Sequence, residues 1–333
     1  MDFIPAGIDM IFSEIDRIDA ENNQVILHDD KHIKYDILII ATGTDIRPEE
    51  TPGLKDKLWY NKIFDFYSLD GALALRDFLR GWDGGTMVVN IVDVPHKCPV
   101  APLEFSFLAD EFFTKKGIRN KVNIKYVTPQ AGAFTKPRAN KMLSGLLEEK
   151  NIEIIPDFYI DRVDNDKSSI IAYDGREIPF DLLTVVPLNM GSDAIGRSGL
   201  GDDLNYIPTN KYTLQSENFE NIFVIGDAAN LPTSKAGAVA HFSSDILFEN
   251  IMSFIEGRPL RAKFDGHANC YIETGYGKGS LIDFNSASII FPSSNNALNS
   301  FSSTSTNSKG LFSSSSCLSS ILSDRPCSKS VLN

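Results

Sequence analysis

The sequence predicts an α/β protein with two doubly wound, mostly parallel sheets. Short apolar stretches rich in β-branched residues alternate with amphipathic stretches of helical length, which is the pattern of such sheets. In the clearest example, a buried strand at Ile222–Ile225 is followed by Gly226 and Asp227. Open α/β sheets place their ligands at this end of a strand. A chain of 333 residues has room for two domains of ordinary size.

The composition excludes several classes of function. The net charge of −12 argues against binding to nucleic acid and against a purely electrostatic hold on anionic lipid. The chain contains no apolar run of the roughly 18 residues that a membrane-spanning helix needs. The first residues lack the basic and then apolar pattern of a signal peptide. We therefore expect a cytoplasmic protein.

The first domain contains two candidate ligand-binding strands. Lys34–Ala41 is predicted to be a buried strand, and Thr42 and Gly43 interrupt it. The strand that ends at Asp227 leads through a polar loop to Lys235, Ala236 and Gly237, where an amphipathic helix begins that reaches about Phe254. The free N–H groups of such a helix point at the ligand crevice, and Asp227 offers a carboxylate to a sugar hydroxyl. The alternative is that Asp227 only caps the turn.

A second α/β unit follows. Gly84–Gly85 precede a strand at Thr86–Val92, which runs into the loop Asp93–Pro102. Its prolines cannot donate the backbone N–H groups that a pyrophosphate needs, so we do not expect nicotinamide dinucleotide binding here. Further elements are predicted in the following order: helix 103–116, strand 121–128, helix 137–150, strand 152–155, a hairpin over 159–173 and a strand at 180–187.

Cys98 is the candidate nucleophile of this unit. It lies in His96–Lys97–Cys98–Pro99, next to two potential cations and just before a helix that begins near Pro102. Positive charge and a helix N-terminus both favour the reactive thiolate. The alternative is an inert core thiol. The other cysteines are distant and form no C-x-x-C pair, so we expect no metal site.

These strings together resemble the pyridine nucleotide-disulfide oxidoreductases. The resemblance is carried by YDILIIATG, HKCPVAP, IGDAANLPTSKAG and HANCYIETG, and it is greatest for the sulfide:quinone oxidoreductase and flavocytochrome c sulfide dehydrogenase branch. It implies two Rossmann-like dinucleotide-binding domains and FAD as cofactor. It also implies cofactor-binding residues, namely Thr42, Gly43, Gly226, Asp227, Lys235, Ala236 and Gly237.

The resemblance further implies a redox cysteine pair. Cys98 matches the substrate cysteine, and Cys270 matches a second cysteine on a C-terminal hairpin. Sulfide would attack the oxidised pair, electrons would pass to FAD and then to quinone, and Pro187–Met190 would line the flavin pocket. His96 and Glu104 are not assigned to catalysis. Peripheral contact with the membrane and a homo-oligomer are also implied.

The resemblance implies that parts of the family pattern are missing. The G-x-G-x-x-G turn of an initial βαβ unit is not found, and the serine-rich stretch from Ser286 to the end departs from the family. We expect a frameshift near Asn285 or an unrelated tail, or else a native disordered tail. Cys317 and Cys327 lie in this serine-rich stretch and are expected to have no role.

The resemblance also predicts how the chain divides into domains. The expected divisions are 1–80 (partial FAD-binding domain), 81–185 (second Rossmann-like domain), 186–262 (return to the first), 263–285 (remnant of an interface domain) and 286–333 (tail).

Three alternatives remain open from the sequence. One is a flavocytochrome c-type flavoprotein, which needs a haem partner and secretion. Another is a type II NADH dehydrogenase, which the loop Asp93–Pro102 and the paired cysteines disfavour. The third is an inactive, truncated flavoprotein that binds no FAD and serves, if at all, as an interaction surface.

Overall fold

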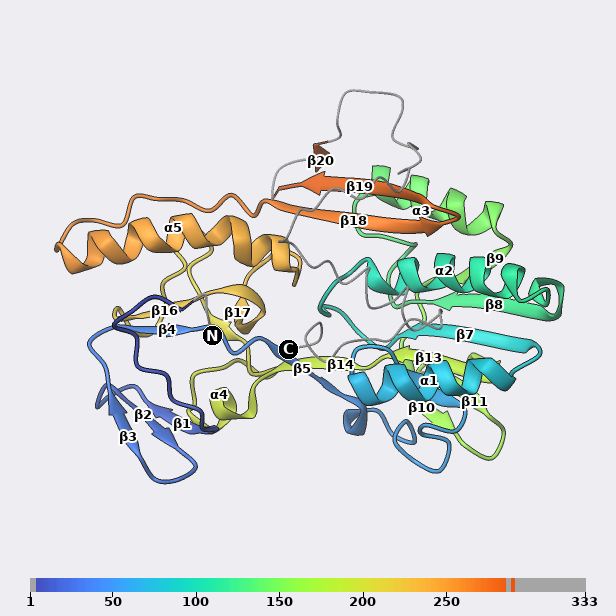
Figure 1. Cartoon of the computed structure of the whole chain (residues 1–333), viewed down its shortest axis with the longest axis horizontal. Helices are drawn as coiled ribbons and strands as arrows, with labels where there is room; N and C mark the ends of the chain where they lie inside the picture. The colour runs from blue at the N-terminus through green and yellow to red at the C-terminus, as the bar shows by residue number, and fades with distance from the viewer. Residues whose placement is uncertain (1–3, 286–288, 291–333) are drawn as a thin grey trace. The chain divides into compact units, whose positions relative to one another are not determined.

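The computed structural model describes residues 4–285 and 289–290 (Figure 1). The chain divides into two compact units. Unit 1 comprises Met1–Thr44, Gly191–Leu231 and Ser243–Phe264, and unit 2 comprises Asp45–Met190, Pro232–Phe242 and Asp265–Asn333. The five divisions expected from the sequence stay a prediction. The compact units group those segments differently, because residues 45–80 lie in unit 2.

Unit 2 is built on a five-stranded parallel sheet. Alternating strands and helices were predicted for this part of the chain, and such an alternation forms a parallel sheet. The strand order is β6-β13-β7-β8-β9. Helices α1, α2 and α3 connect β6 to β7, β7 to β8 and β8 to β9. The bounds are β6 Ile63–Asp65, α1 Leu69–Gly81, β7 Gly85–Ile91, α2 Ala101–Lys115, β8 Val122–Val127, α3 Pro137–Glu149, β9 Ile152–Ile155 and β13 Leu182–Val186.

The core of unit 2 packs sheet residues against a small antiparallel sheet. Strands β10 (Ile160–Asp164), β11 (Ser169–Ala172) and β12 (Glu177–Pro179) form the predicted hairpin and one further strand. Their apolar side chains join those of β7, β8 and β13 in one cluster that includes Val88, Val127, Phe158, Ile170 and Leu183. Continuous apolar strands such as β7 and β13 are expected where a parallel sheet is buried on both faces.

A C-terminal hairpin belongs to unit 2 as well. Strands β18 (Ala268–Gly275) and β19 (Lys278–Phe284) pair antiparallel, and β20 (Ile289–Ile290) adds a short third strand. The two-residue turn Tyr276–Gly277 has φ of 57° and 69°, which suits the right-handed twist of a tight hairpin. Strand β18 packs against α2. The rest of the serine-rich stretch lies outside the described residues.

Unit 1 contains a parallel strand pair and an antiparallel sheet. Strands β4 (Leu38–Ile40) and β16 (Ile222–Val224) pair in parallel. Strands β1 (Ile15–Asp19), β2 (Gln24–Leu27) and β3 (His32–Lys34) form the sheet. The prediction of one buried strand over Lys34–Ala41 was wrong. Lys34 pairs with Gln24 of β2 and is the last residue of β3, β4 covers only Leu38–Ile40, and Ile39 in its middle is 49% exposed.

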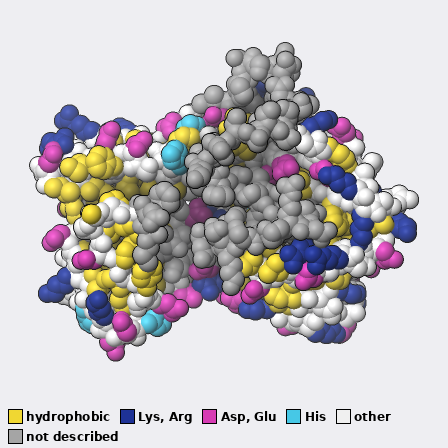
Figure 2. All heavy atoms as spheres, viewed as in Figure 1, with side chains coloured by type: hydrophobic (Ala, Val, Ile, Leu, Met, Phe, Trp, Pro, Cys, Tyr) yellow, Lys and Arg dark blue, Asp and Glu magenta, His cyan; other side chains and the backbone are white. Residues whose placement is uncertain are grey.

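Helix α5 (Gly237–Ile255) follows the β16 segment, as predicted, and the division between the units falls within it. Its inner side contacts β16 through Phe254, whose ring meets that of Phe223. Exposed Phe248, Met252 and Ile255 recur at helical spacing on another side. Figure 2 shows apolar side chains gathered over this helix.

The remaining short elements connect these parts. Strands β5 and β14 pair where the chain passes between the units. Their bounds and those of the other short elements are β5 Thr44–Arg47, β14 Leu188–Gly191, α4 Asp193–Arg197, β15 Ile207–Pro208 and β17 Ala229–Asn230. None of the described helices is both long and apolar enough to cross a membrane.

Candidate active site

The turn after β6 is the first part of the site in unit 2. The Asp65 carboxylate accepts hydrogen bonds from the backbone N–H groups of Tyr67, at 2.9 Å, and Ser68, at 2.6 Å. Ser68 is the N-cap of α1, and its Oγ accepts from Gly71 N–H. A Cβ on Gly71 would lie 2.1 Å from Asp65 Oδ2, so no side chain fits there. This packing fixes the backbone from which Tyr67 projects.

The loop after β7 carries the predicted nucleophile beside this turn. Strand β13 lies between β6 and β7, so the segments that follow all three strands meet at one edge of the sheet. Lys97 N–H donates to Asn189 Oδ1 at 3.1 Å, and Cys98 N–H donates to Lys235 O at 2.7 Å. Cys98 has φ of 52°, a left-handed conformation that is uncommon for a residue with a side chain.

Cys270 lies on β18, and two carboxylates of α2 hold this strand. Glu104 accepts from Glu273 N–H and Glu111 accepts from Tyr276 N–H, both at 2.8 Å. Burial, together with the charges of nearby Cys98 and Glu104, raises the pKa of the Cys270 thiol to about 12. The fold therefore brings the two cysteines predicted from the sequence close together. Among the described residues, neither forms a disulfide.

His96 does not act as the cation expected beside Cys98. Its side chain is only 3% exposed, and burial lowers its pKa to about 4, although a hydrogen bond with Lys97 O opposes the shift. His96 is therefore neutral at pH 7, and that part of the sequence argument for a thiolate was wrong. Its Nε2 has no hydrogen-bond partner among the residues that the structure describes.

The pKa of His96 predicts a dependence of stability on pH. The folded value of about 4 lies below the ordinary value of 6.5, so the unfolded chain binds more protons between these values. The free energy of unfolding should fall as the pH falls through this window, by at most about 3 kcal/mol from this group. We expect His96→Gln to flatten the dependence in urea unfolding at each pH, whereas the exposed control His28→Gln keeps it. If the free energy of unfolding depends on pH in the same way for His96→Gln and wild type, His96 does not have the lowered pKa.

The predicted motifs of unit 1 also lie side by side. Val224 pairs with Ile40, and Ile225 N–H donates to Ile40 O at 3.0 Å, so the segments after the two strands meet at one end. Gly43 and Gly226 have φ of 71° and 70°, which glycine adopts without strain.

Thr42, Gly43 and Asp227 leave room for a ligand at this end of the strand pair. Thr42 is exposed and Asp227 is partly exposed. A Cβ on Gly43 would meet no atom of the described residues within 4 Å. Asp227 also lies near Tyr206, whose pKa is raised by burial and then by the Asp227 charge. Open space, a flexible backbone and a carboxylate are features that suit a ligand with hydroxyl groups.

The predicted site residues are thus divided between the units. Thr42, Gly43, Gly226 and Asp227 lie in unit 1, whereas Lys235, Ala236, Gly237, Cys98 and Cys270 lie in unit 2. Lys235 is buried, and its backbone forms a parallel bridge with Lys97. Tyr67 was missed by the sequence reasoning. It follows β6 in a stretch with no motif, and no local signal marks it. Cys317 and Cys327 lie outside the described residues.

Comparison with known proteins agrees with the resemblance seen in the sequence. No family model matches the chain. The mitochondrial sulfide:quinone oxidoreductase of Dictyostelium discoideum is 29% identical over 85% of the chain and 64% of its own length. That of Mus musculus is also 29% identical, over 84% of the chain and 64% of its own length. The sulfide:quinone oxidoreductase structure from Aquifex aeolicus superimposes with a TM-score of 0.70 at 19% identity, over 84% of the chain and 68% of that protein.

These matches confirm the resemblance and the fold class. The chain is similar to sulfide:quinone oxidoreductases over most of its described length, and it has their α/β architecture. It spans just under two thirds of the length of the two curated relatives.

Proposed function

We propose that this chain carries the catalytic part of an FAD-dependent oxidoreductase that oxidises sulfide and passes the electrons to quinone. The observation that carries the proposal is the convergence of Cys98 and Cys270. They come from a loop after β7 and from the β18 hairpin of unit 2. They lie near enough for the charge of Cys98 to raise the pKa of Cys270. The names of the relatives supply sulfide and quinone as substrates.

The residues of unit 1 fit the proposed cofactor. Asp227 would accept hydrogen bonds from the ribityl hydroxyls of FAD. The described residues leave room for close approach at Gly43, and Gly226 has the positive φ that glycine adopts without strain. Lys235 and Ala236 precede α5 and Gly237 is its first residue, in unit 2, and their role toward the flavin stays a prediction. When bound, FAD supplies an acceptor for two electrons.

The chain's own residues would perform the sulfur chemistry. Hydrosulfide attacks the disulfide between Cys98 and Cys270, so one cysteine becomes a persulfide and the other leaves as a thiolate. Transfer of the outer sulfur to a second hydrosulfide would release a polysulfide and leave both cysteines reduced. Their return to the disulfide releases two electrons, for which bound FAD and then quinone would be the acceptors. The high pKa of Cys270 favours its protonated form in the reduced pair. Glu104 keeps β18, and thus Cys270, at α2.

The quinone substrate places the reaction at a membrane surface, so we propose peripheral attachment. The curated relatives are named mitochondrial. The cytoplasmic location expected from the sequence stays a prediction, and so does a homo-oligomer.

The proposal is tested by reconstituting the purified chain with FAD, followed by gel filtration. The protein fraction should retain the visible absorption of oxidised flavin. Anaerobic sulfide should bleach it, and a soluble quinone should restore it. NADH is the matched second reductant, because bleaching by NADH but not by sulfide would favour the NADH dehydrogenase alternative. A colourless fraction would favour the inactive alternative.

A further inference from the structure

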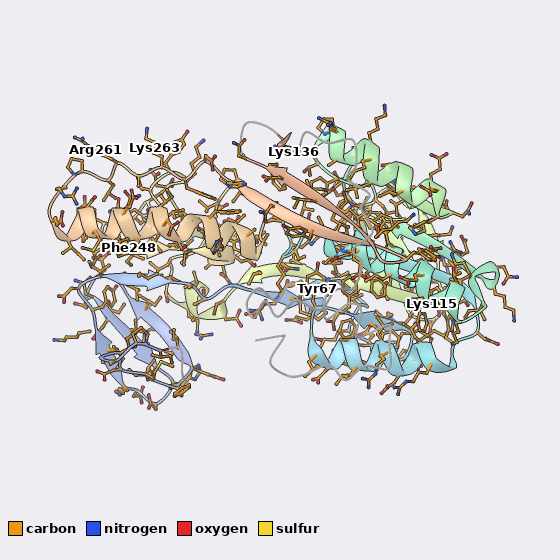
Figure 3. The ribbon with its side chains drawn as sticks, turned by 45° about the horizontal axis from the view of Figure 1, so that its top comes forward. Tyr67, Lys115, Lys136, Phe248, Arg261 and Lys263 are labelled. Carbon is orange, nitrogen blue, oxygen red and sulfur yellow. The ribbon has the colours of Figure 1, made fainter. Side chains whose placement is uncertain are left out.

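We propose that Tyr67 is a positioning residue for Cys98. Its hydroxyl holds the Cys98 backbone in the conformation from which the thiol pairs with Cys270. The proposal rests on the function proposed above, because it concerns the same cysteine pair. Tyr67 belongs to none of the sequence motifs, and it projects from the turn between β6 and α1 (Figure 3).

The Tyr67 hydroxyl contacts three consecutive residues of the cysteine loop. It lies 2.9 Å from Lys97 O, 3.4 Å from Cys98 O and 3.4 Å from His96 Nδ1. The short distance to Lys97 O identifies the main acceptor. One side chain, placed by the Asp65 turn, thus reaches every residue from His96 to Cys98.

The protonation states of these groups fix the direction of the hydrogen bonds. Burial raises the pKa of Tyr67 well above its ordinary value, and charge on Cys98 adds to the shift. Tyr67 therefore keeps its proton and donates it to Lys97 O. His96 is neutral, and its Nδ1 lies 3.3 Å from Lys97 O and 3.4 Å from the Tyr67 oxygen, so Nδ1–H donates toward these two acceptors while Nε2 carries the lone pair. This tautomer agrees with the buried Nε2 that lacks a partner among the described residues, since an orphaned acceptor is tolerated more readily than an orphaned N–H.

The conformation of Cys98 explains why such a restraint is needed. A non-glycine residue at φ of 52° persists only where its surroundings determine it. Lys235 O holds Cys98 N–H, and Asn189 holds Lys97 N–H. Tyr67 supplies a side-chain donor to the carbonyl groups of both residues. Without this hydroxyl, the carbonyl side of the peptide that joins Lys97 and Cys98 loses its shortest hydrogen bond, so the peptide and the Cys98 sulfur are held less firmly.

Bond formation between two cysteines is sensitive to such movement, because disulfide geometry is specific. The test is the thiol–disulfide equilibrium of the chain with dithiothreitol. In this exchange the Cys98 and Cys270 thiols form a disulfide, and their two protons and two electrons pass to oxidised dithiothreitol, which becomes the dithiol. Acid trapping, alkylation and peptide mass spectrometry measure the equilibrium constant without FAD or sulfide.

We expect Tyr67→Phe to lower this constant by at least about fivefold, as befits the loss of one buried hydrogen bond. Tyr126→Phe is the matched control, because it removes another buried tyrosine hydroxyl and should change the constant less than about twofold. 4-Methylphenylalanine at position 67 fills the space of the hydroxyl without a donor and should match Tyr67→Phe. 4-Aminophenylalanine restores a donor and should restore the constant.

Wild-type values for both variants that lack a donor would overturn the proposal. A wild-type chain that forms no Cys98–Cys270 disulfide would overturn it as well. Because the equilibrium needs no turnover, the two proposals fail separately. Suppose that Tyr67→Phe lowers the equilibrium constant with dithiothreitol, but sulfide does not reduce the FAD-loaded chain. The positioning role of Tyr67 would then stand, and the proposed oxidation of sulfide would be wrong.

Discussion

Cys98→Ser in the FAD-loaded chain is expected to slow flavin reduction by sulfide at least about a thousandfold, as loss of a catalytic nucleophile does in other enzymes. The serine hydroxyl is not ionised at neutral pH and cannot form the disulfide that hydrosulfide attacks. Cys270→Ser should have an effect of the same size, because both sulfurs are needed for one bond. Anaerobic stopped-flow absorption measures the rate.

The control for this experiment is Cys317→Ser, which changes a cysteine outside the described residues and should react like wild type. Flavin content should be equal in all three variants. Bleaching at the wild-type rate in either Cys98→Ser or Cys270→Ser would remove the two-cysteine mechanism, even if FAD remained bound.

Asp227→Ala is expected to weaken FAD binding by about ten- to a hundredfold, the range for a hydrogen bond to a charged group. Asp227 follows β16 beside the segment that follows β4, where no other described residue fills the space next to the Gly43 Cα. Fluorescence titration of the flavin measures the dissociation constant. Asp203→Ala, an exposed aspartate in unit 1, should leave it unchanged. Equal affinities for both variants would show that the cofactor does not use this carboxylate.

Much of unit 2 could be predicted from the sequence, because its elements have strong local signals. Strand β7 is an apolar run after two glycines, α2 begins with a proline in its first turn, and β8 is again apolar. Strands of a parallel sheet are buried on both faces and are therefore apolar along their whole length. The alternation of strands and helices along the chain already indicates such a sheet. The β18–β19 hairpin was likewise visible from its glycine-rich turn.

The errors arose where distant contacts decide the structure. His96 is neutral because the packed loop buries it, and nothing in its neighbours along the chain indicates that burial. Tyr67 could not be assigned either. Its contacts with the Cys98 loop join residues about thirty positions apart, across strands whose order in the sheet is not visible in the sequence. Ile39 was expected to be buried, but among the described residues nothing covers it fully.

Peptide mapping of the oxidised chain shows whether Cys98 pairs with Cys270. The chain is treated with oxidised dithiothreitol, its remaining thiols are alkylated, and it is digested without reduction. We expect the Cys98 peptide to be linked to the Cys270 peptide, and we expect sulfide to cleave this link and leave a persulfide on one of the two cysteines. Links that join Cys98 only to Cys317 or Cys327, or two unlinked alkylated peptides, would contradict it.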